Sequence, residues 1–173
     1  MNLRNNEKRV FYKEAYEKLR LHFVYNSMNA VKYYIRKNPE TAASMIDNLA
    51  VFLRGNVENA LEEKWIALSE ELKFARAYAE LECAGNRRLK VEWLFASKEG
   101  TVLSGSIYRS IEKMVKKYVY ENGEECTIWI MDEEDGSAVC VWVEGKEEKD
   151  LIPIRMSAED GGEGSFNEDY HCR

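Results

Sequence analysis

The residues with the clearest chemical potential are a histidine and two asparagines in the segment Leu21–Asn29, which reads LHFVYNSMN. On an α-helix, His22, Asn26 and Asn29 follow one another at i, i+4 and i+7, so they form one polar stripe. Asn26 can then hydrogen-bond one imidazole nitrogen and fix the tautomer while the other nitrogen stays exposed. Such an imidazole is a usable nucleophile toward phosphorus. A surface histidine among amides has the same spacing, so spacing alone leaves both interpretations open.

The rest of the chain offers few groups for catalysis or metal binding. It contains no Walker P-loop, GxSxG or HExxH motif. Its 4 cysteines form no CxxC pair and its 2 histidines lie far apart, so a zinc site is not expected. Cys126 and Cys140 fall in two candidate strands of one hairpin. We expect buried thiols there rather than a disulfide, because nothing in the sequence marks secretion.

Composition excludes several classes of partner. The 173 residues are 45% hydrophobic, which fits one domain or two small ones. With 25 basic and 31 acidic residues the net charge is −6, which argues against affinity for nucleic acid or an anionic membrane. No apolar run approaches the roughly 20 residues that span a bilayer, and no secretory signal opens the chain. We therefore expect a cytoplasmic protein with no nucleic-acid partner and no membrane contact.

The first half of the chain has the apolar spacing of helices. Apolar residues recur at helical intervals from Val10 to Lys37, and the Asn-Pro-Glu sequence at 38–40 then combines a cap, a first-turn proline and a favourable charge. A second helix follows, and Gly55-Asn56 is expected to end or loosen it. Two such helices form a hairpin with little apolar cover of its own. We therefore expect a homodimer in which two hairpins complete a four-helix bundle.

The second half mixes helices and strands, beyond a boundary expected near residues 65–69. A third helix should begin with Ser69 as its N-cap and continue to about Ala84. The other predicted elements are a strand at Leu89–Phe95, a helix at Ser104–Tyr120, and strands at Cys126–Met131 and Ala138–Val143. From Glu144 the chain is acidic and rich in glycine, and we expect much of this tail to be mobile. The fold class is therefore α+β.

The segment His22–Ile35, HFVYNSMNAVKYYI, resembles the HFLYNSLNxI phosphoacceptor box of LytS-type sensor histidine kinases. Residues 45–54 resemble the second helix of that family, residues 68–82 its connector, and residues 88–91 the first strand of its ATPase domain. The resemblance covers about residues 10–95 and is strongest in the first box. It implies a dimerising helical hairpin in which His22 accepts a phosphoryl group from ATP.

The resemblance weakens in the nucleotide-binding boxes. Residues 107–118 stand where the family has LQPLVENAIKHG: Glu112 is kept, but Lys113 replaces the asparagine that helps to hold Mg²⁺. An ammonium has no lone pair and cannot bind a metal. Residues 143–147 replace the DNGxG box without its adenine-binding aspartate, and the GxGxxN spacing at 162–167 lies among acidic residues, where we interpret it as chance.

The preferred interpretation is a two-component signalling protein that receives or transfers a phosphoryl group on His22 and binds little or no ATP. It would have a dimerisation and phosphotransfer hairpin at 1–66, a degenerate Bergerat-like ATPase α/β sandwich at 67–150, and an acidic tail at 151–173. Asn26 and Asn29 would assist the acceptor, whereas Glu112, Lys113 and Lys116 would form a weak relic of the nucleotide site. No cofactor is expected, and ATP and Mg²⁺ would bind only if that site works.

The expected partners are a second copy of the chain and a response regulator or partner histidine kinase. This partner would dock on a face that includes Lys18, His22, Tyr25 and Asn29. Two alternatives remain open at this point. One is an active ATP-dependent histidine kinase fragment, and the other is a non-catalytic dimerisation or inhibitory module that binds a true kinase.

Overall fold

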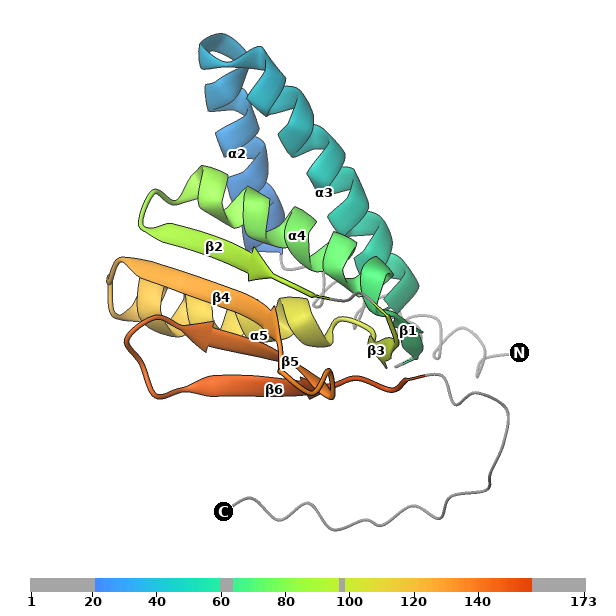
Figure 1. Ribbon diagram of the computed structural model, residues 1–173. Coiled ribbons are helices and arrows are strands. Elements are labelled where there is room, and N and C mark those ends of the chain that lie inside the picture. Colours follow the sequence, from blue (N-terminus) through green and yellow to red (C-terminus); the bar gives the residue numbers. More distant parts are fainter. Residues whose placement is uncertain (1–20, 60–63, 97–98, 157–173) are drawn as a thin grey trace, which may run out of the picture.

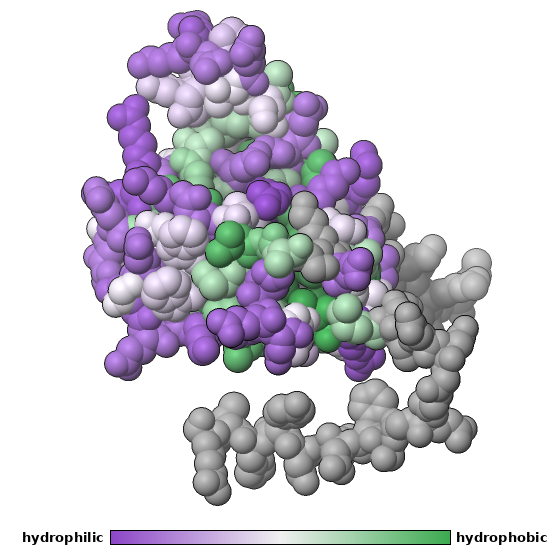
Figure 2. All heavy atoms as spheres, in the orientation of Figure 1, coloured by the Kyte–Doolittle hydropathy of each residue, from purple (hydrophilic) through white to green (hydrophobic). Residues whose placement is uncertain are grey.

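The computed structural model describes residues 21–59, 64–96 and 99–156. N-terminal helices are followed by a mixed four-stranded sheet with further helices, so the α+β class is confirmed (Figure 1). Apolar side chains gather over the sheet unit, whereas the tip of the helical hairpin is mostly hydrophilic (Figure 2). Within the described residues, no helix combines the length and apolarity that crossing a bilayer requires.

The hairpin consists of α2 (Leu21–Lys37) and α3 (Pro39–Asn59). The turn between them forms as the sequence predicts. The Asn38 side-chain oxygen accepts a hydrogen bond from the Thr41 amide at 3.2 Å, which caps the first turn of α3. The Asn38 amide in turn donates to the Tyr34 carbonyl at 2.8 Å and closes the end of α2. One residue therefore ends one helix and begins the next.

The expectation that Gly55 ends or loosens the second helix is wrong, because α3 continues to Asn59. Gly55 serves a packing contact instead. A Cβ at this position would lie 2.3 Å from a ring carbon of Phe74, so only glycine lets that ring approach the α3 backbone. Phe52, one turn earlier, stacks on the Phe74 ring at 5.4 Å between centroids. The glycine thus marks where α3 meets the next helix.

Helix α4 (Leu68–Gly85) follows strand β1 (Trp65–Ala67) without a loop. Ser69 is therefore not the N-cap: Ala67 occupies that position and makes no side-chain cap hydrogen bond. The helix is entered directly from β1, which pairs antiparallel with β3 (Thr101–Leu103), and the Leu68 amide donates to the Gly100 carbonyl at 2.9 Å. The backbone of the β3 segment supplies the partner that a serine cap would otherwise provide.

The larger sheet has the strand order β2-β4-β5-β6. Strand β2 (Leu89–Leu94) runs parallel to β4 (Cys126–Asp132), and the antiparallel strands β5 (Ala138–Val143) and β6 (Lys149–Pro153) follow. The expectation of a mobile tail from Glu144 is therefore wrong for residues 149–153, which pair with β5. Cys126 and Cys140 are buried free thiols on β4 and β5, as the sequence predicts.

Helix α5 (Ser106–Met114) lies behind β4, β5 and β6 in Figure 1 and continues as the π-helix η1 (Val115–Glu121). The sequence predicts one helix over this region but not its change of winding. The wider π turns place Tyr118 and Val119 in the core and leave Tyr120 half exposed between helices. Figure 1 shows the α2–α3 hairpin rising above α4, so α4 separates the hairpin from the sheet.

A cluster of aromatic rings joins the hairpin to the sheet unit. Phe23 of α2 lies 4.7 Å from Phe52 of α3 and 4.9 Å from Tyr78 of α4, measured between ring centroids. Phe74 of α4 lies 4.9 Å from Tyr108 of α5 in an edge-to-face arrangement. We call these five residues the aromatic cluster. It crosses the boundary expected near residues 65–69, because its rings come from both sides of it.

Candidate functional site

The histidine of the polar stripe lies on α2. The His22 side chain is outside the described part of the structure, as is Lys18. The next residues of the stripe, Asn26 and Asn29, are exposed. Phe23, Ser27 and Val31 form the opposite, buried stripe at i, i+4 and i+8. The described part of α2 is therefore amphipathic in the way the sequence predicts, with the amides away from the core.

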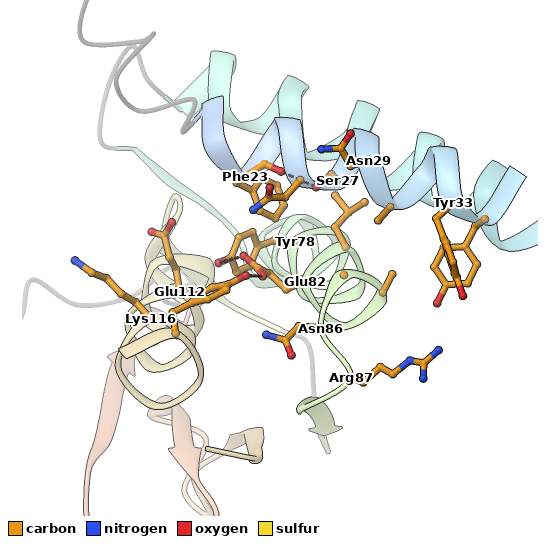
Figure 3. Close-up of a pocket in the computed structure, with 17 residues that line it drawn as sticks. Phe23, Ser27, Asn29, Tyr33, Tyr78, Glu82, Asn86, Arg87, Glu112 and Lys116 are labelled. Atoms are coloured by element: carbon orange, nitrogen blue, oxygen red, sulfur yellow. Dashed lines mark hydrogen bonds between the residues drawn. The ribbon is translucent and has the colours of Figure 1, made fainter. Parts of the chain in front are cut away.

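A cavity of about 950 Å³ lies between α2, α4 and the α5–η1 segment (Figure 3). Asn26 and Asn29 line it from α2, and Glu112 and Lys116 line it from α5 and η1. The structure thus brings together four of the six site residues predicted from the sequence. In Figure 3, Asn29 lies above the cavity, whereas Glu112 and Lys116 lie at one end of it. We call this space the interhelical cavity.

The inner wall of the interhelical cavity is built around Glu82 of α4. Its two carboxylate oxygens accept hydrogen bonds from the Tyr78 hydroxyl at 3.0 Å and the Tyr120 hydroxyl at 2.7 Å. Glu82 and Glu112 are both buried. Burial raises the pKa of the Tyr78 phenol, and the negative charges of Glu82 and Glu112 raise this pKa further. The inner wall therefore combines two buried carboxylates with the Tyr78 and Tyr120 phenols.

Lys113 lies on a different side of α5 from the interhelical cavity. Its ammonium is 2.8 Å from Asp150 and 3.3 Å from Glu148. The hydrogen bond to Asp150 is the main cause that raises the pKa of Lys113. Ser110 donates to the other Asp150 oxygen at 2.6 Å. Strand β6 thus supplies Asp150, the carboxylate that forms an ion pair with Lys113.

Glu148, just before β6, extends this ion network to η1. It accepts hydrogen bonds from Lys117 and from the Tyr118 hydroxyl. The hydrogen bond from Lys117 is the main cause that lowers the pKa of Glu148 to about 2. We call Ser110, Lys113, Lys117, Glu148 and Asp150 the β6 ion network. The sequence did not reveal it, because residues from Glu144 onward were expected to be mobile.

A second, more open hollow of about 500 Å³ lies on the surface of α5 and η1. Here the three predicted nucleotide-helix residues meet, since Glu112, Lys113 and Lys116 all line it. Within the described ranges, no group of three or more histidine, cysteine, aspartate or glutamate side chains has the arrangement to hold a metal ion. The GxGxxN spacing at 162–167 lies outside the described residues.

Glu71 is a structural residue that the sequence interpretation missed. It is fully buried, and its carboxylate accepts hydrogen bonds from the Gly105 amide at 2.7 Å and the Ile107 amide at 3.0 Å. Glu71 therefore caps α5 from α4, where the helix end favours negative charge. A signal was present in the sequence, since position 71 lies on the same helical face as Leu68 and Ala75. An acid on an apolar stripe indicates a buried partner.

Comparison with known proteins bears on the segment that carries the polar stripe. Residues 12–87 match the family model described as "Histidine kinase". This segment is a histidine kinase family domain. The match includes α2, α3 and α4, and it confirms the resemblance inferred from the HFVYNSMN box.

The histidine kinase segment is also similar to parts of several sensor proteins. It is 39% identical over 67 residues to the sensor histidine kinase YpdA of Escherichia coli K12, covering 39% of this chain and 12% of YpdA. It is 32% identical over 63 residues to the sensor histidine kinase BtsS of the same strain, covering 36% of this chain and 11% of BtsS. It is 35% identical over 63 residues to the sensor protein LytS of Enterococcus faecalis, covering 36% of this chain and 10% of LytS. The matched region is thus about a tenth of each relative.

Proposed function

We propose that this protein carries a phosphoryl group on His22 in a two-component pathway and binds ATP weakly or not at all. The observation that carries the proposal is the contrast between two helices. The phosphoacceptor box lies on α2 within the matched family segment, with its two asparagines exposed. On α5, the position of the magnesium ligand is taken by Lys113, which is paired with Asp150. The chain therefore keeps the phosphoacceptor box on α2, although the magnesium-binding residue on α5 is replaced.

The β6 ion network supports weak nucleotide binding. Phosphoryl transfer from ATP depends on cations that stabilise the phosphate oxygens, chiefly Mg²⁺. Lys113 cannot bind a metal, and the carboxylates of Glu148 and Asp150 lie beside it, where they would repel a triphosphate. The charge of Lys113 and Lys117 is therefore balanced by this chain's own acids. The replacement of the magnesium ligand by Lys113 supports the proposal that the Bergerat-like ATPase unit is degenerate.

A homodimer built from the hairpin is part of the proposal. Several large apolar side chains of α2 and α3 are exposed: Met28 by 58%, Ile35 by 55% and Ile46 by 54%. Met28 and Ile35 follow a heptad spacing, which is the pattern of helices that pack against other helices. Packing against the same surface of a second copy would bury these side chains in a four-helix bundle.

The donor or acceptor of the phosphoryl group is proposed to be another protein, either a response regulator aspartate or a partner histidine kinase. Tyr25 and Asn29 are exposed on α2 and belong to the proposed docking face with His22. The proposed division of labour keeps phosphotransfer in the segment up to residue 66 and the nucleotide-binding relic in the segment that follows. Residues 60–63, near this boundary, are outside the described structure.

Two measurements on the full chain test this function. Calorimetric titration with a nonhydrolysable ATP analogue and Mg²⁺ should show no saturable binding in the micromolar range. Incubation with a phosphorylated response regulator or an active partner kinase should place acid-labile phosphate on the protein, and His22→Gln should abolish it. Labelling of His22 by ATP and Mg²⁺ alone would instead establish an active histidine kinase fragment.

The exposed apolar surface of the hairpin also fits a non-catalytic dimerisation or inhibitory module. That function predicts that His22→Ala and His22→Gln leave the activity in cells unchanged. It also predicts that Leu49→Asp or Leu53→Asp, on α3, abolishes this activity. The phosphotransfer proposal predicts loss in all four variants, so the histidine variants separate the two functions.

A further inference from the structure

The four-stranded sheet has one face that packs on α5 and a second face that is turned away from it. Ser110 and Lys113 of α5 contact Asp150 of β6, so Asp150 points to the face that packs on α5. Side chains of a strand alternate between the two faces, so the neighbouring Lys149 and Leu151 point to the second face. We call this second face the outer sheet face. Helix α5 lies behind the sheet in Figure 1, so Figure 2, in the same orientation, views the outer sheet face and shows apolar side chains gathered on it.

The middle of the outer sheet face is apolar. The strand register forms two neighbouring rows across it: Trp129 and Trp142 in one row, and Leu94, Met131, Cys140 and Leu151 in the other. The second row ends at the two sheet edges in exposed leucines. Leu94 on β2 is 61% exposed and Leu151 on β6 is 51% exposed. A contiguous apolar patch of this kind, with a polar border, is typical of an interaction surface.

The two edges of the outer sheet face carry opposite charges in the same row. The row of the two tryptophans begins with Glu92 on β2 and ends with Lys149 on β6. Both side chains are exposed, and within the described ranges neither takes part in a salt bridge. They lie three strand spacings apart, or about 14 Å, so they cannot pair within one copy. Because β2 and β6 run in the same direction, the exposed Lys90 and Glu147 repeat this arrangement two residues earlier, with the charges exchanged.

A second copy of the chain has the complementary arrangement of this face. If the second copy is turned by 180° about an axis along the strands, β2 of each copy lies over β6 of the other. Glu92 then faces Lys149 of the second copy, and Leu94 faces Leu151. Each contact occurs twice, because a two-fold interface is self-complementary. The two sheets would pack face to face about 10 Å apart, as in a β-sandwich.

We propose that the outer sheet face pairs with the same face of a second copy of this chain. The pairing goes beyond phosphotransfer and needs neither His22 nor a nucleotide. It is also separate from the proposed hairpin dimer, because α2 and α3 take no part in it. The face is small, so the dissociation constant should be roughly 100–500 µM, at the weak end for a specific interface. At the low micromolar concentrations of a sizing column, only the hairpin dimer would remain.

The variant Ile46→Glu isolates the sheet pairing, because it changes an exposed α3 residue of the proposed hairpin dimer. Small-angle X-ray scattering of this full-length variant, from about 20 µM to 1 mM, should show a monomer that becomes a dimer as the concentration rises. The chain without this substitution should form assemblies larger than a dimer over the same range. An Ile46→Glu variant that is still monomeric at about 1 mM would overturn the proposal.

Charge reversal in the Ile46→Glu background locates the pairing. Glu92→Lys would place lysines opposite each other at two symmetric contacts, and Lys149→Glu would do the same with carboxylates. Each should therefore raise the dissociation constant about 10-fold. The double variant Glu92→Lys/Lys149→Glu restores opposite charges and should return the dissociation constant to its starting value. Because the two residues cannot pair within one copy, this rescue would require a second copy.

Lys73→Glu is the matched control, because Lys73 is exposed on α4 rather than on the outer sheet face. This variant should leave the dissociation constant unchanged, and far-UV circular dichroism checks that every variant is folded. Two outcomes would refute the pairing. One is a dimer that neither single reversal weakens, and the other is a double variant that associates no better than the single ones.

Discussion

Glu71, buried between α4 and α5, should make the stability of this protein depend on pH. Burial raises the pKa of Glu71 to about 7 from a usual 4.5, against the hydrogen bonds of Gly105 and Ile107, which lower it. Between these two pH values the folded protein holds a proton that the unfolded chain has released. The free energy of unfolding should therefore fall as pH rises from about 4.5 to 7, by roughly 3 kcal/mol from this group.

The variant Glu71→Gln cannot titrate, so its stability should rise relative to the wild type between pH 5 and pH 8. Urea unfolding at both pH values measures this difference. Glu70→Gln is the control, because Glu70 is exposed in the same turn, and it should follow the wild type. Parallel curves for Glu71→Gln and the wild type would show that Glu71 keeps its ordinary pKa.

Gly55 should not tolerate a larger side chain, for a steric reason. Alanine normally stabilises a helix relative to glycine by about 1 kcal/mol. Here the added Cβ would meet the Phe74 ring at 2.3 Å, so Gly55→Ala should lower the free energy of unfolding by about 1–3 kcal/mol. Gly85→Ala, which has nothing within 4 Å of its Cβ, should cost far less. Thermal unfolding of both variants compares the two sites, and equal losses would contradict the packing argument.

At the scale of elements, the hairpin leaves an apolar surface exposed that a second hairpin would cover. Ile46 is 54% exposed on α3, so Ile46→Glu should convert the proposed dimer to a monomer without changing its helical content. Light scattering coupled to size-exclusion chromatography measures the mass. Leu151→Glu, at a 51% exposed leucine of β6, is a matched control that should leave the mass unchanged. A wild-type protein that is already monomeric at high micromolar concentration would reject the dimer.

Elements with strong periodic patterns could be predicted, and those defined by distant partners could not. The alternating β-branched residues of β4 and β5 indicated both strands within one residue of their observed ends. Strands β1 and β3 have three residues each, too few to show alternation. Strand β6 contains a lysine, an aspartate and a proline, and its order depends on pairing with β5 and on Lys113 of α5. Such long-range partners leave no local signal.

The candidate site divides in the same way. The stripe of His22, Asn26 and Asn29 could be predicted because helical spacing is a local property. The pairing of Lys113 with β6, away from the interhelical cavity, could not be predicted, because it depends on carboxylates that lie 35 and 37 residues farther along the chain, Glu148 and Asp150. Glu82 was assigned only to the connector pattern. Its role at the inner wall needs Tyr120, which η1 brings alongside.

For the whole molecule, the aromatic cluster should make hairpin and sheet unfold together. Phe52 is 2% exposed and contacts rings on α2, α4 and α5, so Phe52→Ala should cost about 3–5 kcal/mol. Circular dichroism at 222 nm follows the helices. Fluorescence follows the four tryptophans, all of which lie in strands: Trp65, Trp93, Trp129 and Trp142. Within each protein, wild type or variant, the circular dichroism and fluorescence signals should change at the same urea concentration. Two separate transitions in one protein would show that the hairpin and the sheet are independent units.

The aromatic cluster also restricts movement of the hairpin relative to the sheet unit. Asn26 and Asn29 of α2 already line the same cavity as Glu112 and Lys116 of the α5–η1 segment. Moving the hairpin relative to α5 would separate five packed rings from four helices and expose them to water. A hairpin held in this way is suited to exchange a phosphoryl group with a second protein that docks on it.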